Sequence, residues 1–168
     1  MANSPPIFRG SIPFNKQILM IWFVSIDLKK IHKEGRGYSW PNPSCCLRCK
    51  NWKVWGHGYV ERYFDGFVEA LLIKCYLCPG CGCVITLRPK SHFVRIHSST
   101  ETIRLHIFHR IKTGRWPSSS LPRSRLRHWL FNLKRRLQAF LTAAWDQGVQ
   151  AGFEELLSQG QTPISRLS

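Results

Sequence analysis

Two cysteine pairs constrain the fold of this chain more than any other feature of its sequence. The first pair is CLRC, with Cys46 and Cys49, and the second is CPGC, with Cys78 and Cys81. A Cys-x-x-Cys turn directs two thiolates at one point, and two such turns supply the four soft ligands of a tetrahedral structural zinc site. Residues 50–77 leave room for a β-hairpin between the two turns. We therefore predict one structural Zn²⁺, held by Cys46, Cys49, Cys78 and Cys81.

Other roles for the cysteines fit this sequence less well. A disulfide framework needs an oxidising compartment, and the 7 cysteines of the chain would leave one unpaired. A thioredoxin-like redox site has one Cys-x-x-Cys beside a βαβ pattern, and neither pair has that setting. Substitution of a ligand by a nearby thiol or a histidine stays open, and the candidates are Cys45, Cys83, His57, His92 and His97.

The charge of the chain indicates what kind of partner it has. Its 168 residues include 25 Lys and Arg against 9 Asp and Glu, which gives a formal charge of +16. Such an excess favours a polyanionic partner, first nucleic acid and second an anionic membrane surface. Hydrophobic residues make up 43% of the chain, so it can bury a core. Free thiols indicate a reducing cytoplasm.

The longest apolar run, ILMIWFVSI at residues 18–26, is too short to cross a membrane. A spanning helix needs about 20 apolar residues. A signal peptide would be followed by small residues at a cleavage site, whereas Asp27, Lys29 and Lys30 follow here. We interpret the run as a buried strand or short helix and expect no membrane partner.

The pattern predicts an α+β fold, in which a small antiparallel zinc ribbon precedes a basic helical segment. Strands are expected over residues 59–64, 67–77 and 84–87, with a turn at Gly56–Gly58 and a hairpin turn at Asp65–Gly66. The expected parts of the chain are an N-terminal arm with a short apolar element at 1–40, the zinc ribbon at 41–97, the basic helical segment at 98–158 and a flexible tail at 159–168.

Two amphipathic helices and a short third one are expected after residue 97. Ser98–Glu101 matches the capping box at a helix start, and isoleucines at four-residue spacing follow until Gly114 ends the helix. SSSLP at residues 118–122 predicts a second N-terminal cap with proline in the first turn. Apolar residues at spacings of three and four then run over residues 126–145. The last short helix is expected at 149–157.

The basic residues concentrate in this helical segment. Residues 88–136 contain many Lys and Arg but a single acid, Glu101. One helix, a turn with glycine and a second basic helix form the outline of a helix-turn-helix; the alternative is a solvated basic face on an ordinary helical hairpin. Base readout is expected from arginines near the start of the second helix. The candidate DNA contacts are Arg115, Arg123, Arg125, Arg127, His128, Lys134 and Arg135.

The order of these motifs resembles a known family. The first knuckle is followed by WGHGYVERYF at residues 55–64, then by CPGCGCVITLRP at 78–89, and then by the basic helices. This order is similar to the N-terminal zinc-ribbon and helix-turn-helix modules of bacterial insertion-sequence transposases, and to small transposon-associated proteins built from those modules alone. The similarity covers residues 40–140. Cys45 and Cys83 depart from the family pattern as extra thiols beside the ligands.

The resemblance implies a zinc-dependent DNA-binding protein associated with a mobile element. Its partners would be double-stranded DNA and a separately encoded transposase or recombinase, and it would act in the cytoplasm at the nucleoid. Two alternatives stay open: an RNA-binding protein, and a zinc-ribbon adaptor that docks on a recombinase or transposase through an aromatic face. That face would comprise Trp52, Trp55, Tyr59, Tyr63 and Phe64.

No enzymatic reaction is expected of this chain. A transposase nuclease core uses three acidic residues on a large α/β scaffold to hold two metal ions. After Glu101 the acidic residues are Asp146, Glu154 and Glu155, close to the end of the sequence. A catalytic zinc would also need an open coordination position, which four cysteines do not leave. Transposition chemistry would therefore belong to another chain.

Overall fold

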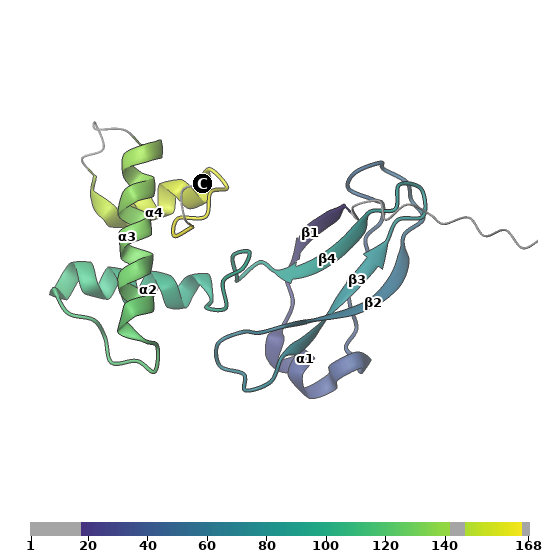
Figure 1. Cartoon of the computed structure of the whole chain (residues 1–168), viewed down its shortest axis with the longest axis horizontal. Coiled ribbons are helices and arrows are strands. Elements are labelled where there is room, and N and C mark those ends of the chain that lie inside the picture. Colours follow the sequence, from purple (N-terminus) through teal and green to yellow (C-terminus); the bar gives the residue numbers. More distant parts are fainter. Residues whose placement is uncertain (1–17, 142–146, 166–168) are drawn as a thin grey trace, which may run out of the picture. The chain divides into compact units, whose positions relative to one another are not determined.

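A computed structural model describes residues 18–141 and 147–165 of the protein. The chain divides into two compact units, one built from the residues up to Arg62 together with Glu69–Pro89, and the other from Tyr63–Val68 together with the residues from Lys90 onward. In chain order the elements are β1 (Leu19–Val24), α1 (Leu28–Glu34), a 3₁₀ turn (Gly35–Gly37), β2 (Trp55–Arg62), β3 (Leu71–Leu77), β4 (Val84–Pro89), α2 (Thr100–Thr113), α3 (Arg123–Phe140) and α4 (Gly148–Ser158), as labelled in Figure 1. This composition confirms the predicted α+β class.

The first unit is a four-stranded sheet with the order β1-β4-β3-β2. β3 pairs antiparallel with β2 and β4, but β1 pairs parallel with β4. The sheet is therefore mixed, whereas a purely antiparallel ribbon was predicted, because the apolar run before residue 27 adds an edge strand. Only part of that run is buried: Val24 is 5% exposed and Leu19 is 70% exposed.

Strand β2 starts earlier than the sequence pattern predicts. The expected turn at Gly56–Gly58 is wrong, because β2 runs through these residues and pairs Gly56 with Tyr76 of β3. The register shifts between Gly56 and Tyr59, and Gly58 has φ +94°. A glycine adopts this backbone freely, so the segment forms a bulge inside the strand. Asp65 and Gly66 do form a turn, but it lies inside the longer connection 63–70, because β2 ends at Arg62 and β3 starts at Leu71 rather than at residue 67 as predicted.

Helix α2, the first helix of the second unit, begins one residue later than the capping-box pattern suggests. Ser99, not Ser98, is the N-cap of α2, and its side chain accepts a hydrogen bond from the Thr102 N–H at 3.0 Å. Glu101 instead pairs with Arg104 at 3.0 Å. The helix ends at Gly114, as predicted, in the left-handed conformation that glycine tolerates.

Helix α3 differs from its prediction at the start. Pro122 occupies the N-cap position and no side chain caps the helix, so the predicted cap in SSSLP is wrong. The predicted extension to residue 145 falls on residues 142–146, which lie outside the described part of the chain. Residues 114–122 connect α2 to α3, which is longer than the three- or four-residue turn of a helix-turn-helix.

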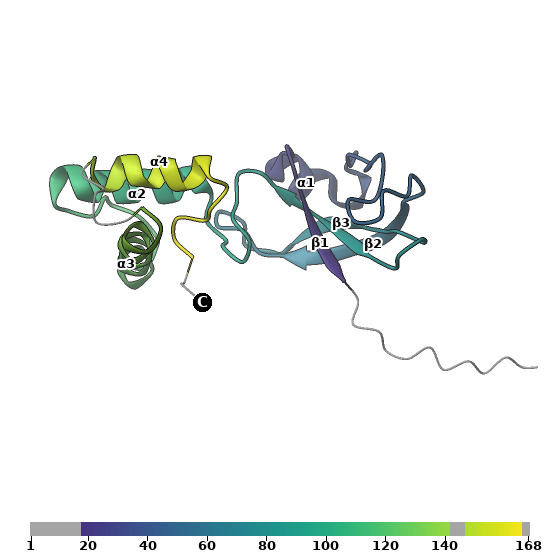
Figure 2. The ribbon, with the colours of Figure 1, turned by 90° about the horizontal axis from the view of Figure 1, so that it is seen from above.

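The three helices of this unit pack on one another around a shared core (Figure 2). Ile164 belongs to this core and is 3% exposed, and the Gln161 N–H before it donates to the Leu156 carbonyl at 2.8 Å. This part of the chain differs from the flexible tail expected at 159–168. The buried core residues are Ile103, Ile107, Leu126, Trp129, Leu133, Leu137, Phe153, Leu156 and Ile164.

Candidate metal centre and basic groove

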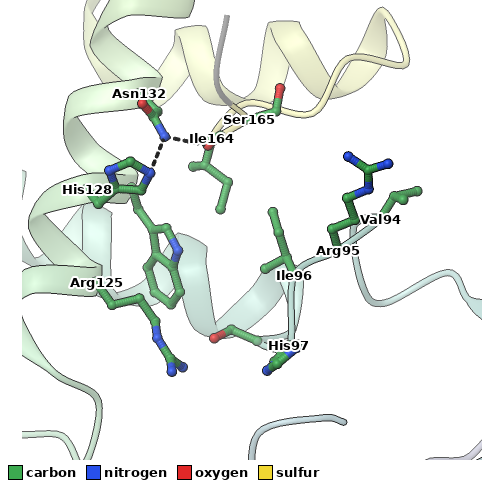
Figure 3. A pocket seen from close by; sticks show the side chains of 11 residues that line it. Val94, Arg95, Ile96, His97, Arg125, His128, Asn132, Ile164 and Ser165 are labelled. Carbon is green, nitrogen blue, oxygen red and sulfur yellow. Dashed lines mark hydrogen bonds between the residues drawn. The ribbon is translucent and has the colours of Figure 1, made fainter. Parts of the chain in front are cut away.

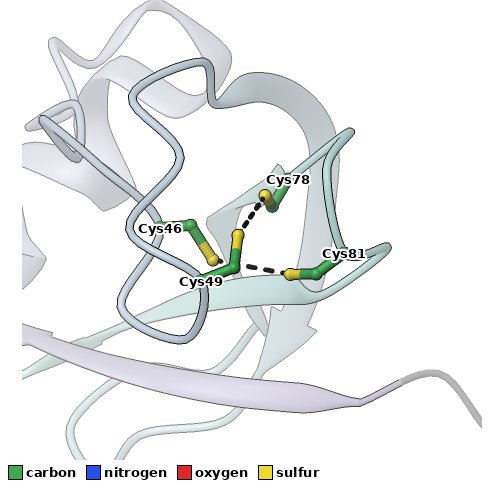
Figure 4. Close-up of side chains that lie close together, drawn as sticks. All are labelled: Cys46, Cys49, Cys78 and Cys81. Carbon is green, nitrogen blue, oxygen red and sulfur yellow. Dashed lines mark hydrogen bonds between the residues drawn. The ribbon is translucent and has the colours of Figure 1, made fainter.

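The structure brings together the four cysteines that the spacing selected. The sulfur atoms of Cys46, Cys49, Cys78 and Cys81 all lie within 4.8 Å of one another (Figure 4). The Sγ atoms of Cys46 and Cys81 are 3.7 Å apart, and those of Cys49 and Cys78 are 3.4 Å apart. Tetrahedral ligands at a metal–sulfur distance of about 2.3 Å would be separated by about 3.8 Å. The cluster therefore has dimensions that fit one metal ion.

The backbone of each knuckle closes in the same way. The Lys50 N–H donates to the Cys46 carbonyl, and the Gly82 N–H donates to the Cys78 carbonyl, both at 2.9 Å. Lys50 and Gly82 both have a positive φ, of 60° and 66°. The chain thus reverses just after each second cysteine, so that both thiols of a pair point to one centre. The first knuckle precedes β2, and the second joins β3 to β4.

Two thiols of the cluster, those of Cys46 and Cys49, have very different pKa values. Burial raises the pKa of Cys46, but hydrogen bonds from the backbone amides of Cys49 and Arg48 and from neighbouring thiols outweigh burial and lower this pKa to about 6. The Asn51 amide lowers the pKa of Cys49, yet the hydrogen bond with Cys78 and burial dominate and raise it to about 12. Of these two thiols, Cys46 therefore ionises first and is the first of the pair that can bind a metal cation as a thiolate.

The alternative ligands are not members of the four-cysteine group, although the Cys83 thiol lies close enough to interact with Cys46. Cys83 is buried, and its carbonyl accepts a hydrogen bond from the Cys78 N–H at 3.0 Å. His57 is exposed on β2, whereas the His92 ring contacts Phe64 with centroids 4.9 Å apart. Across residues 18–141 and 147–165, the structure places none of the substitute thiols or histidines in a metal-binding group; the cluster contains the four predicted cysteines.

The second unit contains a groove lined by cations, here called the basic groove. Its volume is about 540 Å³, and its lining comes from the end of α2, the connection after it and one face of α3. No acidic side chain lines it within the described part of the chain. The lining residues are Arg110, Arg115, Trp116, Arg123, Arg127, Leu130, Phe131 and Lys134.

Aromatic rings hold some of these cations in place. The Arg110 guanidinium lies 5.6 Å from the Trp116 ring centroid. The guanidinium of Arg135, an exposed neighbour outside the groove lining, lies 5.8 Å from the Phe131 ring centroid. A cation over an aromatic face is attracted by the ring quadrupole while its outer N–H groups remain available. The groove therefore presents oriented donors next to flat apolar surfaces.

Two of the predicted DNA contacts lie in a different pocket of the same unit, with a volume of about 600 Å³ (Figure 3). The Arg125 Nη1 donates to both carboxylate oxygens of Asp65, at 3.0 and 3.1 Å. The His128 Nε2 accepts a hydrogen bond from the Asn132 Nδ2 at 2.9 Å. Asn132 also donates to the Ile164 carbonyl at 3.1 Å. Arg125 and His128 thus have partners within the protein.

The seven predicted DNA contacts fall into three groups: those that line the basic groove, those in the other pocket (Arg125 and His128), and Arg135, which lines neither. Arg115, Arg123, Arg127 and Lys134 line the basic groove. Sequence reasoning missed its other four members, Arg110, Trp116, Leu130 and Phe131. A usable signal existed: residues 123, 127, 130, 131 and 134 recur at the spacing of one helix face. Arg125 is outside this stripe.

Comparison of the chain with protein-family models, with curated proteins and with solved structures found no match. The likeness to transposase modules stays a prediction that rests on the motifs. Within the described residues, no helix combines the length and the apolar character that a bilayer crossing requires.

Proposed function

We propose that this protein is a zinc-stabilised, double-stranded-DNA-binding protein whose helical unit contacts the duplex through the basic groove. The observation that carries this proposal is the groove itself, in which five cations converge without an acidic neighbour in its lining. A groove of this charge attracts a polyanion. When its cations contact DNA phosphates, counterions are released from the DNA, and this release supplies most of the affinity. The formal charge of +16 supports the same class of partner.

Zinc is the metal that best suits the cysteine cluster. Four thiolates in a tetrahedral set are ligands for zinc or for iron, and zinc in such a closed site is structural. Two Cys-x-x-Cys knuckles joined by the antiparallel strands β2, β3 and β4 support a zinc-ribbon interpretation of the first unit. The bound ion would fix the two loops that carry the ligands, and the proposal assigns no reaction to it.

The proposed mode of binding follows from the groove lining. Arg123 and Arg127 lie one helical turn apart on α3, and Lys134 extends the same face. These side chains would contact phosphates, while Arg110 and Arg115 would contact them from the neighbouring segment. The start of α3 has no acidic residue in its first turn and no side-chain cap, so its amide groups favour an anion.

The link to a mobile element rests on the motif resemblance. On that basis the DNA would be the terminal sequence of an insertion element, and a separately encoded transposase would perform strand chemistry. The protein would then act at the nucleoid as the DNA-recognition component. A helix-turn-helix in the strict sense is not needed for this proposal, because the groove provides the contact surface.

A double variant of the groove tests the proposed function. Arg123→Ala/Arg127→Ala is compared with Lys29→Ala/Lys30→Ala, which removes the same charge from exposed positions of α1 in the other unit. Binding of zinc-loaded protein to a labelled duplex is measured by fluorescence anisotropy over a series of salt concentrations. Each lost phosphate contact lowers the slope of log affinity against log salt by about 1.

The groove variant is expected to lower this slope by about 2, whereas the control changes it little. Equal effects in the two variants would reject the groove as the contact surface. A parent protein that binds no duplex would reject DNA binding altogether. Sequencing of DNA retained from a random duplex pool would then establish whether binding is sequence-specific.

A further inference from the structure

Two tryptophan side chains close to the cysteine cluster lie in solvent. Trp52 is 80% exposed and Trp55 is 57% exposed, whereas Trp129 in the helical core is 5% exposed. Large aromatic side chains are usually buried in a core or used at an interface. The exposure of both indoles leaves them available to a partner.

The two tryptophans are held close together at one edge of the sheet. Trp52 follows Cys49 by three residues, and Trp55 is the first residue of β2, which is an edge strand. Three residues of extended chain span at most about 10 Å. The Cα atoms of the two tryptophans are therefore at most about 10 Å apart, a span that neighbouring nucleotides of one strand can cover. Because Cys49 belongs to the metal cluster, metal binding would also restrain the segment that carries Trp52.

The charge around these tryptophans is positive. Arg48, Lys50 and Lys53 are exposed, and residues 35–60 contain no Asp or Glu. A metal-loaded cluster of four thiolates carries a net negative charge, which Arg48 and Lys50 offset because they flank Cys49. Lys53 lies between Trp52 and Trp55 in the sequence, and its positive charge remains available to an anion.

Lys74 is the other cation near the start of β2, and it occupies the space beside Gly56, which has no side chain. The Lys74 Nζ is 3.3 Å from the position that a Cβ of Gly56 would occupy. This ammonium also lies 4.5 Å from the Tyr59 ring centroid. A side chain at residue 56 would displace the ammonium from this position. Trp55 pairs with Leu77, whereas Gly56 pairs with Tyr76. Adjacent residues of a strand point to opposite faces, so Lys74 does not belong to the surface around Trp55.

We propose that Trp52, Trp55 and Lys53, here called the tryptophan surface, bind single-stranded DNA. Unpaired bases stack on the indole faces, and the Lys53 ammonium contacts the phosphate between them. This combination of aromatic rings and cations is how proteins hold single strands without reading a sequence. The choice of DNA rests on the proposed function, in which the basic groove holds the duplex part of the same molecule and the tryptophan surface holds an unpaired segment.

Exchanging the tryptophans separates stacking from simple apolar contact. Trp52→Leu/Trp55→Leu keeps apolar side chains but removes the flat π faces, whereas Trp52→Phe/Trp55→Phe keeps a π face. Zinc-loaded, full-length proteins are titrated into labelled oligothymidine of about 15 nucleotides, a duplex of equal length and oligouridine RNA, with anisotropy as the readout. Metal content and circular dichroism establish that each variant is folded.

The leucine variant is expected to bind oligothymidine at least about tenfold more weakly than the parent, and the phenylalanine variant to retain most of the affinity. Duplex affinity stays unchanged in both. Parental affinity in the leucine variant, an equal loss on duplex, or tighter binding of RNA than of DNA would each overturn the proposal. Failure of the proposed function is distinguishable, because there the Arg123→Ala/Arg127→Ala variant would leave duplex binding unaltered.

Discussion

Lys50 and Gly82 occupy equivalent places in the two knuckles but differ in conformational cost. Each donates its N–H to the carbonyl of the first cysteine of its pair, and each has a left-handed backbone. That conformation costs an ordinary L-residue about 1–2 kcal/mol and costs glycine almost nothing. The first knuckle therefore contains a backbone cost that the second avoids, and metal binding has to hold it closed.

A pair of substitutions tests this difference. Gly82→Ala is expected to lower the free energy of unfolding by about 1 kcal/mol. The loss is conformational, because a Cβ at residue 82 would meet no atom within 4 Å. Lys50→Gly removes the strain but gives the unfolded chain more freedom, so its net effect is below about 1 kcal/mol. Guanidinium unfolding of the zinc-loaded proteins measures both; a larger loss for Lys50→Gly would contradict the argument.

Arg125 shows how a partner from a distant segment changes the role of a side chain. Its ion pair with Asp65 is joined by the Ser98 hydroxyl, which also donates to Asp65, and by the Asp65 N–H, which donates to the His97 carbonyl. The carboxylate is thus the centre of a small network that holds the Tyr63–Val68 segment to its unit. We infer that Arg125 stabilises this connection and that Arg127 contacts DNA.

Arg125→Ala should therefore affect stability rather than DNA affinity. The two side chains are 38% and 29% exposed, so the ion pair contributes at most about 1 kcal/mol. Duplex affinity is expected to stay within about twofold of the parent, whereas Arg127→Ala weakens it. Anisotropy and chemical unfolding of the two variants provide the comparison. An equal loss of affinity in both would return Arg125 to the DNA interface.

The unequal thiol pKa values predict how metal affinity depends on pH. Metal binds thiolates, so a thiol whose pKa exceeds the ambient pH releases a proton on binding. At pH 7 the Cys49 thiol, whose pKa is about 12, still has to release its proton, whereas Cys46, whose pKa is about 6, is already a thiolate in most molecules. Below about pH 6 Cys46 also takes up a proton, so affinity should fall more steeply. Competition with a chromophoric chelator between pH 5 and about 8 tests for this change of slope; a constant slope would contradict it.

At the scale of the element, one face of α3 packs in the core and another lines the basic groove. Leu133 is 0% exposed in the helical core, whereas its neighbour Lys134 is exposed and lines the basic groove. Adjacent helical residues point about 100° apart, because a turn takes 3.6 residues. One helix can therefore contribute to stability through one stripe and to binding through another.

Substitution of these neighbours should separate the two duties. Leu133→Ala leaves a cavity in the core and is expected to cost about 2–5 kcal/mol of unfolding free energy. Lys134→Ala should leave stability within about 0.5 kcal/mol and lower the salt slope of DNA binding by about 1. Thermal melting and duplex titrations measure the two effects. A loss of stability in Lys134→Ala comparable with that of Leu133→Ala would refute this division.

At the scale of the whole molecule, the chain consists of two units with different sources of stability. The sheet unit contains the cysteine cluster, and the helical unit has a core of its own. The sheet unit also buries apolar residues such as Leu71, Ile73 and Ile85, and a metal bound to the cluster would add to its folding free energy by fixing the two knuckles. Loss of the metal should therefore affect the two units unequally.

Chelation tests this difference in the full-length protein. Removal of zinc is expected to lower the melting temperature of the sheet unit and to expose Tyr76, which is buried at present, while most of the helical circular dichroism persists. Readdition of zinc should reverse the change. A single cooperative loss of all signals on chelation would mean that the helical unit depends on the metal as well.

The cysteine cluster was predictable from sequence because the geometry within each cysteine pair is local. Two residues between paired cysteines determine where both thiols point, and Gly82 supplies the left-handed backbone that the second knuckle needs. The helix stop at Gly114 was predictable for the same reason. Charge was also visible in the sequence, since residues 88–136 have a single acid, although its distribution over faces was not.

Tertiary structure decided what depends on segments far apart in the chain. The parallel pairing of β1 with β4 joins Leu19 to Val84, and the pairing of Gly56 with Tyr76 turns an expected loop into strand. Arg125 and Arg127 are equivalent by composition, yet Asp65 neutralises one and leaves the other in the groove. Cysteine spacing and glycine conformation act over a few residues, whereas burial and ion pairing depend on which distant segments meet, and that is a property of the folded chain alone.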